Sequence, residues 1–250
     1  MNLETICIKE LQHVGAFIRA HAFNQGVVEW KGTDDPVTSV DKQAEHYLRE
    51  GLAQHVDASF VGEEHEDVIS SSPVRFYIDP IDGTKSFLRK EFLSSLSLAV
   101  EENGELTHGF VYDFMKDILY AGTPQGSYLL FAGKKHTLPL AKESFSKPTF
   151  SYDGKRLEKL HSEQVSLRQA SGSIALVLSQ LTTSYDGLLL EPRKTGVYDV
   201  AGGYVVLRQA GYVLTDFFGK SFDYKKPDSG LLAYSSSHAG KVLALRDDAL

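Results

Sequence analysis

The sequence lacks the residues and segments that mark several large classes of protein. It has one cysteine, Cys7, among 250 residues, so it can form neither an internal disulfide nor a zinc site built from thiolates. It contains no run of about 18 uninterrupted apolar residues, so no transmembrane helix is expected. Its first residues are helix-patterned and partly acidic instead of basic and then apolar, so no signal peptide is expected. These absences make the cytoplasm the expected location.

The chain also lacks an excess of positive charge. It carries 26 Lys and Arg residues against 33 Asp and Glu residues, a formal net charge of −7, so nucleic-acid binding is not expected as its main role. A small anionic substrate would need local cations, either basic side chains or metal ions, to offset this field. With 42% hydrophobic and 24% charged residues, the composition is that of a globular protein with a sizeable core.

Hydrophobic periodicity predicts two helices at the start of the chain. Apolar residues at helical spacing indicate an amphipathic helix over residues 3–22. Glycine, aspartate and proline break the pattern over residues 24–41, which are expected to form a loop. A second helix is expected from about residue 38 to residue 54, because Thr38 and Asp41 have the spacing of a capping box. Its expected buried stripe consists of Val40, Ala44, Tyr47, Leu48 and Leu52.

The middle of the chain is predicted to be rich in strands. Short segments with β-branched and aromatic residues are separated by polar or glycine-containing turns, a pattern typical of mainly antiparallel strands. The expected strands are residues 58–62, 74–79, 92–101, 106–114, 117–122 and 126–133.

The last part of the chain mixes both kinds of element. Residues 136–170 are polar and give no clear pattern. Beyond them a helix is expected over 172–183, a strand over 185–192, and a further helix over 198–211 with Gly211 as its C-cap. Helices first, then strands, then mixed elements are typical of a layered α/β or α+β arrangement.

Acidic residues follow two of the expected strands. Glu63 and Glu64 follow the first, and Asp79 and Asp82 follow the second, with the carbonyl group of Ile81 between the two aspartates. Carboxylates this close repel each other unless something positive lies between them. Hard oxygen donors without a cysteine or histidine cluster favour Mg²⁺ or Mn²⁺ over zinc. The sequence therefore predicts a divalent-cation site.

The residues around the two aspartates also suit a bound anion. Pro80 is expected to keep the strand from continuing with normal pairing and to fix the local backbone. Gly83 permits a close approach to its backbone, and its N–H group, with that of Thr84, could face an anion.

Each acidic segment taken alone has an ordinary structural explanation. Asp-Pro and Asp-Gly pairs are common in turns, Glu63 and Glu64 would suit a solvated turn, and Asp199 could be the N-cap of the helix after it. An EF-hand is excluded, because position 12 counted from Asp79 is Lys90 instead of glutamate. The combination of segments therefore carries the prediction.

The combination consists of four segments. They are DPVTSVD (35–41), VGEE (61–64), DPIDGT (79–84) and YDVAGG (198–203). Together they resemble the inositol monophosphatase family of magnesium-dependent, lithium-sensitive phosphatases, which also includes 3′(2′),5′-bisphosphate nucleotidases and histidinol-phosphate phosphatases. The resemblance implies a layered αβαβα sandwich, often found as a homodimer. It implies an N-terminal α+β subdomain over residues 1–133 with most metal ligands, and a C-terminal α/β subdomain over 134–250 that supplies Asp199 and the substrate pocket.

The resemblance implies a set of metal ligands. Glu63, Asp79 and the carbonyl of Ile81 match the ligands of a first Mg²⁺ ion. Asp79, Asp82 and Asp199 match those of a second. Glu63 would also help to hold a third, weaker ion, so two to three Mg²⁺ ions are expected, with Mn²⁺ as an alternative.

The same resemblance implies the catalytic groups. Asp41 and Thr84 match the pair that orients the attacking water, with Glu63 assisting. Lys31 matches a lysine near the phosphate on a mobile loop, and the N–H groups of Gly83 and Thr84 would bind phosphate oxygens. The implied reaction is hydrolysis of a phosphate monoester by a metal-activated water, without a covalent intermediate.

The residues that would contact the rest of the substrate leave its identity open. Gly172 and Ser173 match small residues of the family's pocket, and Glu191 is a candidate acceptor for ring hydroxyls. Lys85 is more typical of members acting on 3′-phosphoadenosine 5′-phosphate or histidinol phosphate, whereas the spacing after Thr84 is similar to that of the inositol branch. The expected substrate is a small phosphorylated metabolite of the inositol monophosphate type, and the other two types stay open.

A binding or regulatory protein on a phosphatase scaffold is the main alternative of another class. It would be favoured by the loss of a metal ligand, but every matching ligand is present. An enzyme that forms a covalent aspartyl phosphate is disfavoured, because its nucleophile motif needs aspartates two positions apart instead of three. Neither a membrane nor a nucleic acid is an expected partner.

Overall fold

The computed structural model describes residues 2–32, 35–142, 147–160 and 162–250. The helices in these ranges are α1 (Leu3–Ala20), α2 (Ser39–Ala53), α3 (Thr84–Arg89), α4 (Ile174–Gln180), α5 (Val197–Gln209) and α6 (Ala239–Ala249). Within the same ranges, no helix is both long enough and apolar enough to cross a lipid bilayer.

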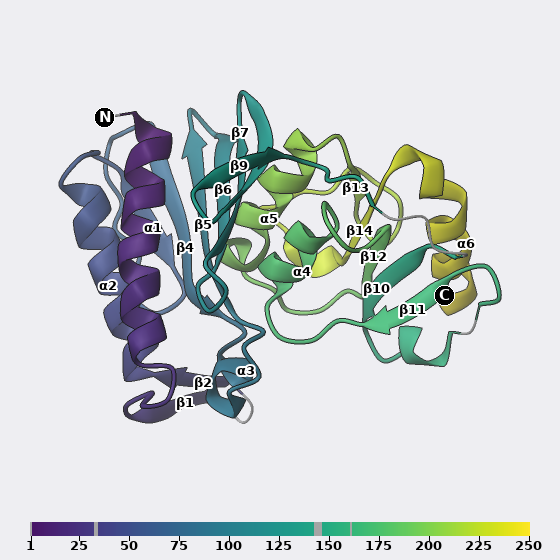
Figure 1. Ribbon diagram of the computed structural model, residues 1–250, viewed down its shortest axis with the longest axis horizontal. Coiled ribbons are helices and arrows are strands. Elements are labelled where there is room, and N and C mark those ends of the chain that lie inside the picture. Colours follow the sequence, from purple (N-terminus) through teal and green to yellow (C-terminus); the bar gives the residue numbers. More distant parts are fainter. Residues whose placement is uncertain (1, 33–34, 143–146, 161) are drawn as a thin grey trace.

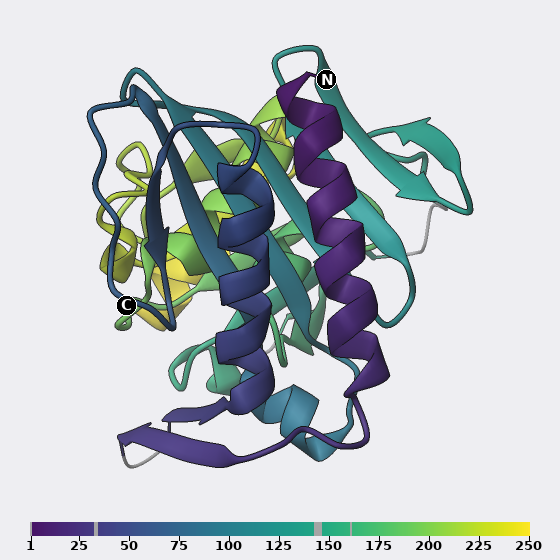
Figure 2. The same ribbon diagram turned by 90° about the vertical axis from the view of Figure 1, so that its left-hand side faces the viewer.

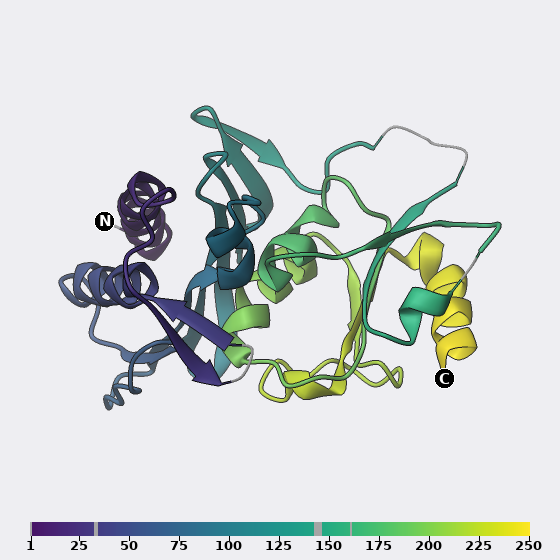
Figure 3. The same cartoon turned by 90° about the horizontal axis from the view of Figure 1, so that it is seen from below.

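The elements stack in five layers (Figure 1). Helices α1 and α2 cover the outer face of a seven-stranded sheet, and helix α6 covers the outer face of a five-stranded sheet. Helices α4 and α5 lie between the two sheets, which Figure 3 shows from below. The predicted layered αβαβα sandwich is therefore confirmed.

Helices α1 and α2 lie side by side across the larger sheet (Figure 2). Their apolar stripes, which include Cys7, Leu11 and Leu48, share one core with Phe76 and Phe110 of the sheet. Both helices were predicted to within about two residues of their observed ends, and Thr38 and Asp41 form the predicted capping box.

The prediction that Tyr47 belongs to the buried stripe of α2 is wrong. Tyr47 is 40% exposed, whereas Glu45 is fully buried. Glu45 is turned toward residues 63–66, where it accepts from the Glu64 N–H group and forms an ion pair with Arg49. Tyr47 lies at the margin of the buried face, with its ring edge against Phe17.

The larger sheet is built, in chain order, from β3 (Ser59–Gly62), β4 (Val74–Asp82), β5 (Ser95–Glu102), β6 (Glu105–Asp113), β7 (Ile118–Thr123), β8 (Gly126–Phe131) and β9 (Lys134–Thr137). Strands β3 and β4 are parallel, and every other neighbouring pair is antiparallel. The predicted strands are confirmed. Strand β9 lies beyond position 133, the expected end of the first subdomain, yet pairs with β8.

The prediction that Pro80 keeps its strand from continuing with normal pairing is confirmed. Strand β4 continues to Asp82, with Asp79 opposite Ser97 and Asp82 opposite Ser95 of β5. From Asp79 to Asp82 strand β4 advances three residues while β5 advances two, so β4 contains a β-bulge. The bulge accommodates Pro80, whose nitrogen cannot donate to the ladder, and it lets the two aspartates both lie at the end of the strand.

The predicted loop at 24–41 instead contains a hairpin of β1 (Val28–Gly32) and β2 (Asp35–Thr38). The apolar residues Val28 and Trp30 alternate with the charged residues Glu29 and Lys31, a strand pattern that the surrounding turn-forming residues obscured. The hairpin and α3 lie at the same end of the molecule (Figure 1). Helix α3 was not predicted, because six residues are too few to show helical periodicity.

The smaller sheet is formed by β10 (Thr149–Asp153), β11 (Ser166–Gln169), β12 (Gly187–Leu190), β13 (Val213–Thr215) and β14 (Leu231–Tyr234). Its order is β11-β10-β12-β14-β13, with β10 parallel to both neighbours and β14 antiparallel to both of its own. Only β12 was predicted. The predicted helices over 172–183 and 198–211 correspond to α4 and α5, and Gly211 directly follows the C-cap residue Ala210.

Candidate active site

The structure brings together acidic residues that are far apart in the sequence. Glu63 follows β3, and Asp79 lies near the end of β4. Because these strands are parallel, their carboxyl ends meet, and the Glu63 N–H group donates to the Ile78 carbonyl at 3.2 Å. Asp199 comes from the first turn of α5. Carboxylate oxygens of Glu63, Asp79 and Asp199 all lie within 4.8 Å of one another.

Glycines allow α5 to lie directly on the larger sheet. A Cβ atom at Gly109 of β6 would clash with the Gly202 carbonyl oxygen, and one at Gly122 of β7 would come within 2.6 Å of another backbone oxygen of α5. The Ser97 hydroxyl on β5 donates to the Tyr198 carbonyl at 3.0 Å. These contacts place the first turn of α5 over the end of β4.

Asp199 is the third residue of α5, so the expectation that it is the N-cap is wrong. The N-cap is Gly196, whose N–H group donates to Asp199 Oδ2 at 2.7 Å. Burial raises the pKa of Asp199 to about 7, the Gly196 N–H opposes this shift, and repulsion from Glu63 adds to it.

Asp79 is the most enclosed member of this group. Its side chain is 1% exposed, and its Oδ1 atom has no hydrogen-bond partner in the described part of the chain. Burial raises the pKa of Asp79 well above its usual range, and repulsion from Glu63, Asp82 and Asp199 adds to the shift. A buried carboxylate oxygen without a partner is costly unless a cation neutralises it.

Asp82 stands slightly apart from these three carboxylates. Its Oδ2 atom accepts hydrogen bonds from the Ser173 hydroxyl and the Ala175 N–H group, both at 2.7 Å. Burial, and then repulsion from Asp199, raises the pKa of Asp82 to about 8, although these hydrogen bonds oppose the shift. Ser173 also caps α4 by accepting from the Leu176 N–H group at 2.9 Å. Asp82 therefore joins the end of β4 to the start of α4.

These residues fit a divalent cation. The group offers only oxygen donors, one of which is buried without a partner among the described residues, and mutual repulsion opposes the full ionisation of its carboxylates. Oxygen ligands of this kind suit Mg²⁺ and Mn²⁺. The structure thus brings together the side chains of the predicted ligands, whereas the identity and number of the ions stay predictions.

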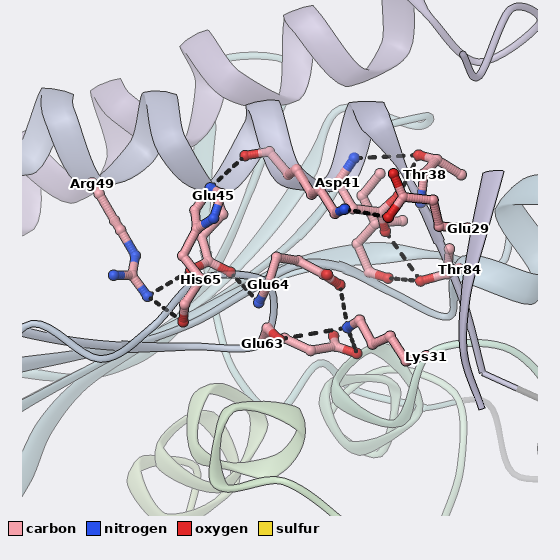
Figure 4. A network of polar contacts seen from close by, with 12 residues as sticks. Glu29, Lys31, Thr38, Asp41, Glu45, Arg49, Glu63, Glu64, His65 and Thr84 are labelled. Carbon is pink, nitrogen blue, oxygen red and sulfur yellow. Dashed lines mark hydrogen bonds and ion pairs between the residues drawn. The ribbon is translucent and has the colours of Figure 1, made fainter. Parts of the chain in front are cut away.

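The predicted water-orienting pair is in contact. Thr84 Oγ1 lies 3.1 Å from Asp41 Oδ1 and 3.0 Å from the Ile81 carbonyl oxygen (Figure 4). Asp41 Oδ2 accepts from the Thr38 N–H group at 3.0 Å and from the Thr38 hydroxyl. Burial raises the pKa of Asp41 to about 6, and the hydrogen bonds from Thr38 and Thr84 limit the shift. The residue that closes the capping box of α2 is therefore also the partner of Thr84.

Lys31 reaches the acidic segment from strand β1 instead of from a loop. Its Nζ atom lies 3.2 Å from Glu63 Oε1 and 2.8 Å from Glu64 Oε1 (Figure 4). Burial opposes the charged form of Lys31, but the two carboxylates outweigh it and raise its pKa to about 12. Burial raises the pKa of Glu64 to about 7, Lys31 opposes this shift, and Glu63 adds to it. No pattern in the sequence assigned Glu64 a role of its own.

A cavity of about 730 Å³ opens beside these groups. The predicted residues Gly83, Thr84 and Gly172 line it, whereas Ser173 lies behind its wall and supports Asp82. Four basic residues share the lining, Lys85 and Arg89 from α3 and Arg193 and Lys194 from the segment before α5. The pair at 193–194 was missed, although its place six and five positions before Asp199 was an available signal.

Glu191 does not share this lining, as far as the described residues define it. Its Oε1 atom accepts from the N–H groups of Arg156 and Leu157 at 2.7 and 2.9 Å, at a short 3₁₀ helix (η1, Leu157–Lys159). Its expected contact with substrate hydroxyls therefore stays a prediction, and these contacts give it a structural role.

The chain is similar to known proteins along most of its length. The model of the Inositol monophosphatase family matches residues 2–250. The chain is 27% identical over 253 residues to an inositol-1-monophosphatase of Bacillus subtilis, with 95% of this chain and 94% of the relative covered. It is 30% identical over 221 residues to a fructose-1,6-bisphosphatase/inositol-1-monophosphatase of Thermotoga maritima, with 85% and 84% covered.

Solved structures share the same architecture. An IMPase of Thermotoga maritima superposes with a TM-score of 0.85 at 23% sequence identity, covering 100% of this chain and 98% of that chain. At this identity the likeness supports the fold alone.

Proposed function

The chain belongs to the inositol monophosphatase family of phosphoric monoester hydrolases, and on this premise we propose that it hydrolyses a small phosphate monoester of the inositol monophosphate type with the help of Mg²⁺. The observation that carries the proposal is the buried, unpartnered Asp79 oxygen grouped with Glu63 and Asp199 in the described part of the chain. The Asp41–Thr84 hydrogen bond beside the same cavity supports it further.

The proposed metal ligands come from the end of β4 and from two residues outside that strand, one after β3 and one in α5. Bound there, Mg²⁺ or Mn²⁺ supplies positive charge against the phosphate and the leaving oxygen and eases the ionisation of water. We propose two to three ions. Their ligands are Glu63, Asp79, Asp82, Asp199 and the carbonyl oxygen of Ile81.

The chain's own groups orient the attacking water. When the Thr84 hydroxyl donates to Asp41, the Thr84 oxygen is left free to accept a hydrogen bond from a water molecule in the cavity. Asp41, with a pKa of about 6, is mostly ionised at neutral pH and can accept the proton that Thr84 passes on. Displacement is then direct, without a covalent intermediate.

We propose that the N–H groups of Gly83 and Thr84, at the start of α3, bind phosphate oxygens. Gly83 has a φ of +87°, and a Cβ atom there would lie 2.8 Å from the Ser173 nitrogen, so the close packing of this turn requires glycine. The turn lines the cavity beside Thr84. Lys31, held near Glu63, adds a positive charge at the same end of the site.

Phosphate release tests this proposal. The substrates are inositol monophosphates, 3′-phosphoadenosine 5′-phosphate, histidinol phosphate and fructose 1,6-bisphosphate, each with and without Mg²⁺. We expect Mg²⁺-dependent turnover that the Asp82→Asn variant loses by orders of magnitude while its circular dichroism spectrum stays native. Near-normal turnover in this variant would contradict the metal role. Mg²⁺ binding without turnover on any substrate would favour a binding or regulatory protein instead.

A substrate with a second anionic group is the other candidate, because Lys85, Arg89, Arg193 and Lys194 line the cavity. A 3′(2′),5′-bisphosphate nucleotide or a sugar bisphosphate would use these cations, and histidinol phosphate would use them less. Replacing Lys194 with Met should raise KM for a bisphosphate several-fold more than KM for inositol monophosphate. Equal effects on both substrates would remove this candidate.

The remaining expectations stand as proposals. They are a homodimer, a cytoplasmic location and a division into subdomains at residues 1–133 and 134–250. The presence of two sheets with separate cores supports the division.

A further inference from the structure

We infer that Glu45 and Arg49 of helix α2 are positioning residues, which hold residues 63–66 in the conformation that directs Glu63 toward Asp79 and Asp199. The inference rests on the metal site of the proposed function. It adds two side chains to that site, neither of which belongs to its acidic group or to the lining of its cavity as the described residues define them.

Glu63 needs such support because neighbouring carboxylates oppose its position, although Lys31 Nζ lies 3.2 Å from its Oε1 atom. It lies just beyond the end of β3, a strand of four residues at the edge of its sheet. Two other carboxylates lie within 4.8 Å of its own and repel it when no cation is bound. In the described part of the chain, the backbone of Glu63 has two contacts, its N–H bond to Ile78 and a 3.5 Å contact between its carbonyl oxygen and Lys31 Nζ.

Glu45 supplies the first part of that support. It is fully buried, and its Oε2 atom accepts from the Glu64 N–H group at 2.8 Å (Figure 4). Its Oε1 atom lies 2.6 Å from Nη2 of Arg49, one helical turn further along α2. A hydrogen bond from a backbone N–H group to an ionised carboxylate is stronger than one between neutral groups.

Arg49 extends the same support to the next two residues. Its Nη1 atom donates to the Glu66 carbonyl at 2.9 Å, and its Nη2 atom donates to the His65 carbonyl at 3.3 Å. The ring of His65 adds a further link to α2, with Nε2 2.9 Å from the Lys42 carbonyl oxygen. The ion pair therefore binds backbone groups of three successive residues directly after Glu63.

The end of β3 is shaped to fit this ion pair. A Cβ atom at Gly62 would clash with Glu45 Oε1 and would lie 2.7 Å from Arg49 Nη2. Both charged groups therefore occupy the space that a side chain at position 62 would fill. This packing fixes the direction in which the chain leaves the strand, immediately before Glu63.

One face of α2 thus positions two parts of the site. Asp41, Glu45 and Arg49 are spaced by four residues and lie on the same side of the helix. The first contacts Thr84, and the other two hold the segment that follows Glu63 (Figure 4). The rigid helix therefore sets the distance between the water-orienting hydroxyl and the Glu63 carboxylate.

Calorimetric titration of the metal-free protein with Mg²⁺ tests the inference. The variants Glu45→Gln and Arg49→Met are expected to weaken Mg²⁺ binding by roughly 10- to 100-fold, the effect typical of losing a group that orients a metal ligand. Arg49→Met leaves a buried carboxylate without its cation. Because Glu45→Gln removes that unpaired charge, the loss of Mg²⁺-binding free energy in the double variant should be smaller than the sum of the losses in the two single variants.

Arg75→Met is the matched control. Arg75 forms an ion pair at 3.0 Å with Glu101, whose side chain is also buried, but neither residue belongs to the described lining of the cavity. This variant should lower the melting temperature and leave the Kd for Mg²⁺ unchanged. If Arg49→Met does not fold, Arg49→Lys keeps the charge without the forked geometry and should still bind Mg²⁺ several-fold more weakly than the wild type.

The outcomes separate the two proposals. Every folded variant at positions 45 and 49 could have a Kd for Mg²⁺ within about twofold of the wild-type value and a melting temperature lowered as in Arg75→Met. That result would show a purely structural role and overturn the inference. A wild-type protein that binds no Mg²⁺ would overturn the proposed metal site itself, and the inference with it. Weaker binding confined to the variants at positions 45 and 49 supports the positioning role.

Discussion

The Thr84 hydroxyl has two acceptors within reach, Asp41 and the carbonyl of Ile81. One acceptor belongs to the helix that covers the sheet, and the other belongs to the bulge that carries Asp79 and Asp82. A single hydroxyl group therefore links the proposed proton acceptor to the proposed metal site. Because Thr84 contributes no metal-binding atom to the described acidic group, its chemistry can be separated from metal binding by substitution.

We expect Thr84→Ala to lower kcat by roughly 10²- to 10⁴-fold, the range typical of losing a positioned proton-transfer group. Thr84→Ser keeps the hydroxyl and should retain most of the activity. Steady-state kinetics at saturating Mg²⁺ measures both effects, and calorimetry should give both variants a Kd for Mg²⁺ close to that of the wild type. A Thr84→Ala variant with near-normal kcat would exclude the proposed role of the hydroxyl.

At the scale of elements, the approach of α5 to the larger sheet decides where Asp199 lies. The helix rests on backbone atoms, because β6 and β7 present glycines at the contact. Backbone atoms cannot rotate away as side chains do, so this contact tolerates no added volume. The same surface that stabilises the middle of the molecule therefore also fixes the position of Asp199, a proposed metal ligand.

Gly122→Ala should destabilise the protein by about 1–3 kcal/mol through overpacking. Its Cβ atom would meet the backbone of Val205 at 2.6 Å, and only a shift of α5 could relieve the contact. Because such a shift moves Asp199, the Kd for Mg²⁺ should rise as well. Urea denaturation and calorimetry measure the two effects.

Gly240→Ala is the control for this substitution. Gly240 lies in α6, and a Cβ atom there meets no described atom within 4 Å, so the change should leave stability unchanged or raise it slightly. If Gly122→Ala matched this control in both stability and Mg²⁺ binding, the backbone contact would not determine the position of α5.

At the scale of the whole molecule, the site lies where the two halves of the chain meet. Glu63, Asp79 and Asp82 come from the larger sheet, whereas Asp199 and the groups that bind Asp82 come from α5 and α4. Repulsion among the carboxylates therefore acts across the joint between the halves. A bound cation should turn this repulsion into attraction and stabilise the entire fold.

The metal-free protein is expected to lose stability as pH rises from about 4 to about 8. Folding raises the pKa of Asp82 to about 8 and those of Asp199 and Glu64 to about 7, whereas unfolded carboxyl groups titrate near about 4. Between these limits the folded state binds more protons than the unfolded state, so stability falls with increasing pH. Melting temperatures measured with EDTA at several pH values test this expectation.

Added Mg²⁺ should reverse the trend, because it binds the ionised carboxylates that high pH produces. Asp199→Asn removes one of these groups and should give a shallower fall with pH in EDTA than the wild type. A metal-free melting temperature that rose steadily across the same pH range would contradict the raised pKa values.

Local patterns were enough to predict α1, α2 and the strands β3 to β8 of the larger sheet and, with the family resemblance, which acidic residues lie close together. They failed for the strands β1, β2, β9, β10, β11, β13 and β14, which are short or polar and depend on their neighbours for pairing. They also missed helix α6. They also failed for Glu45 and Lys194, because the contact of Glu45 with Glu64 and the place of Lys194 in the cavity lining arise only from tertiary packing. Charged residues at helical spacing normally indicate a solvated face, so nothing in the sequence distinguished a buried pair.

The hairpin that carries Lys31 also carries Trp30, the single tryptophan of the chain, which is 61% exposed. Indole fluorescence therefore reports on this hairpin and on no other element. A change in emission during a Mg²⁺ or phosphate titration would register a displacement of the strand that carries Lys31, without any attached dye. The molecule thus contains its own optical probe, one residue away from a charge that contacts the site.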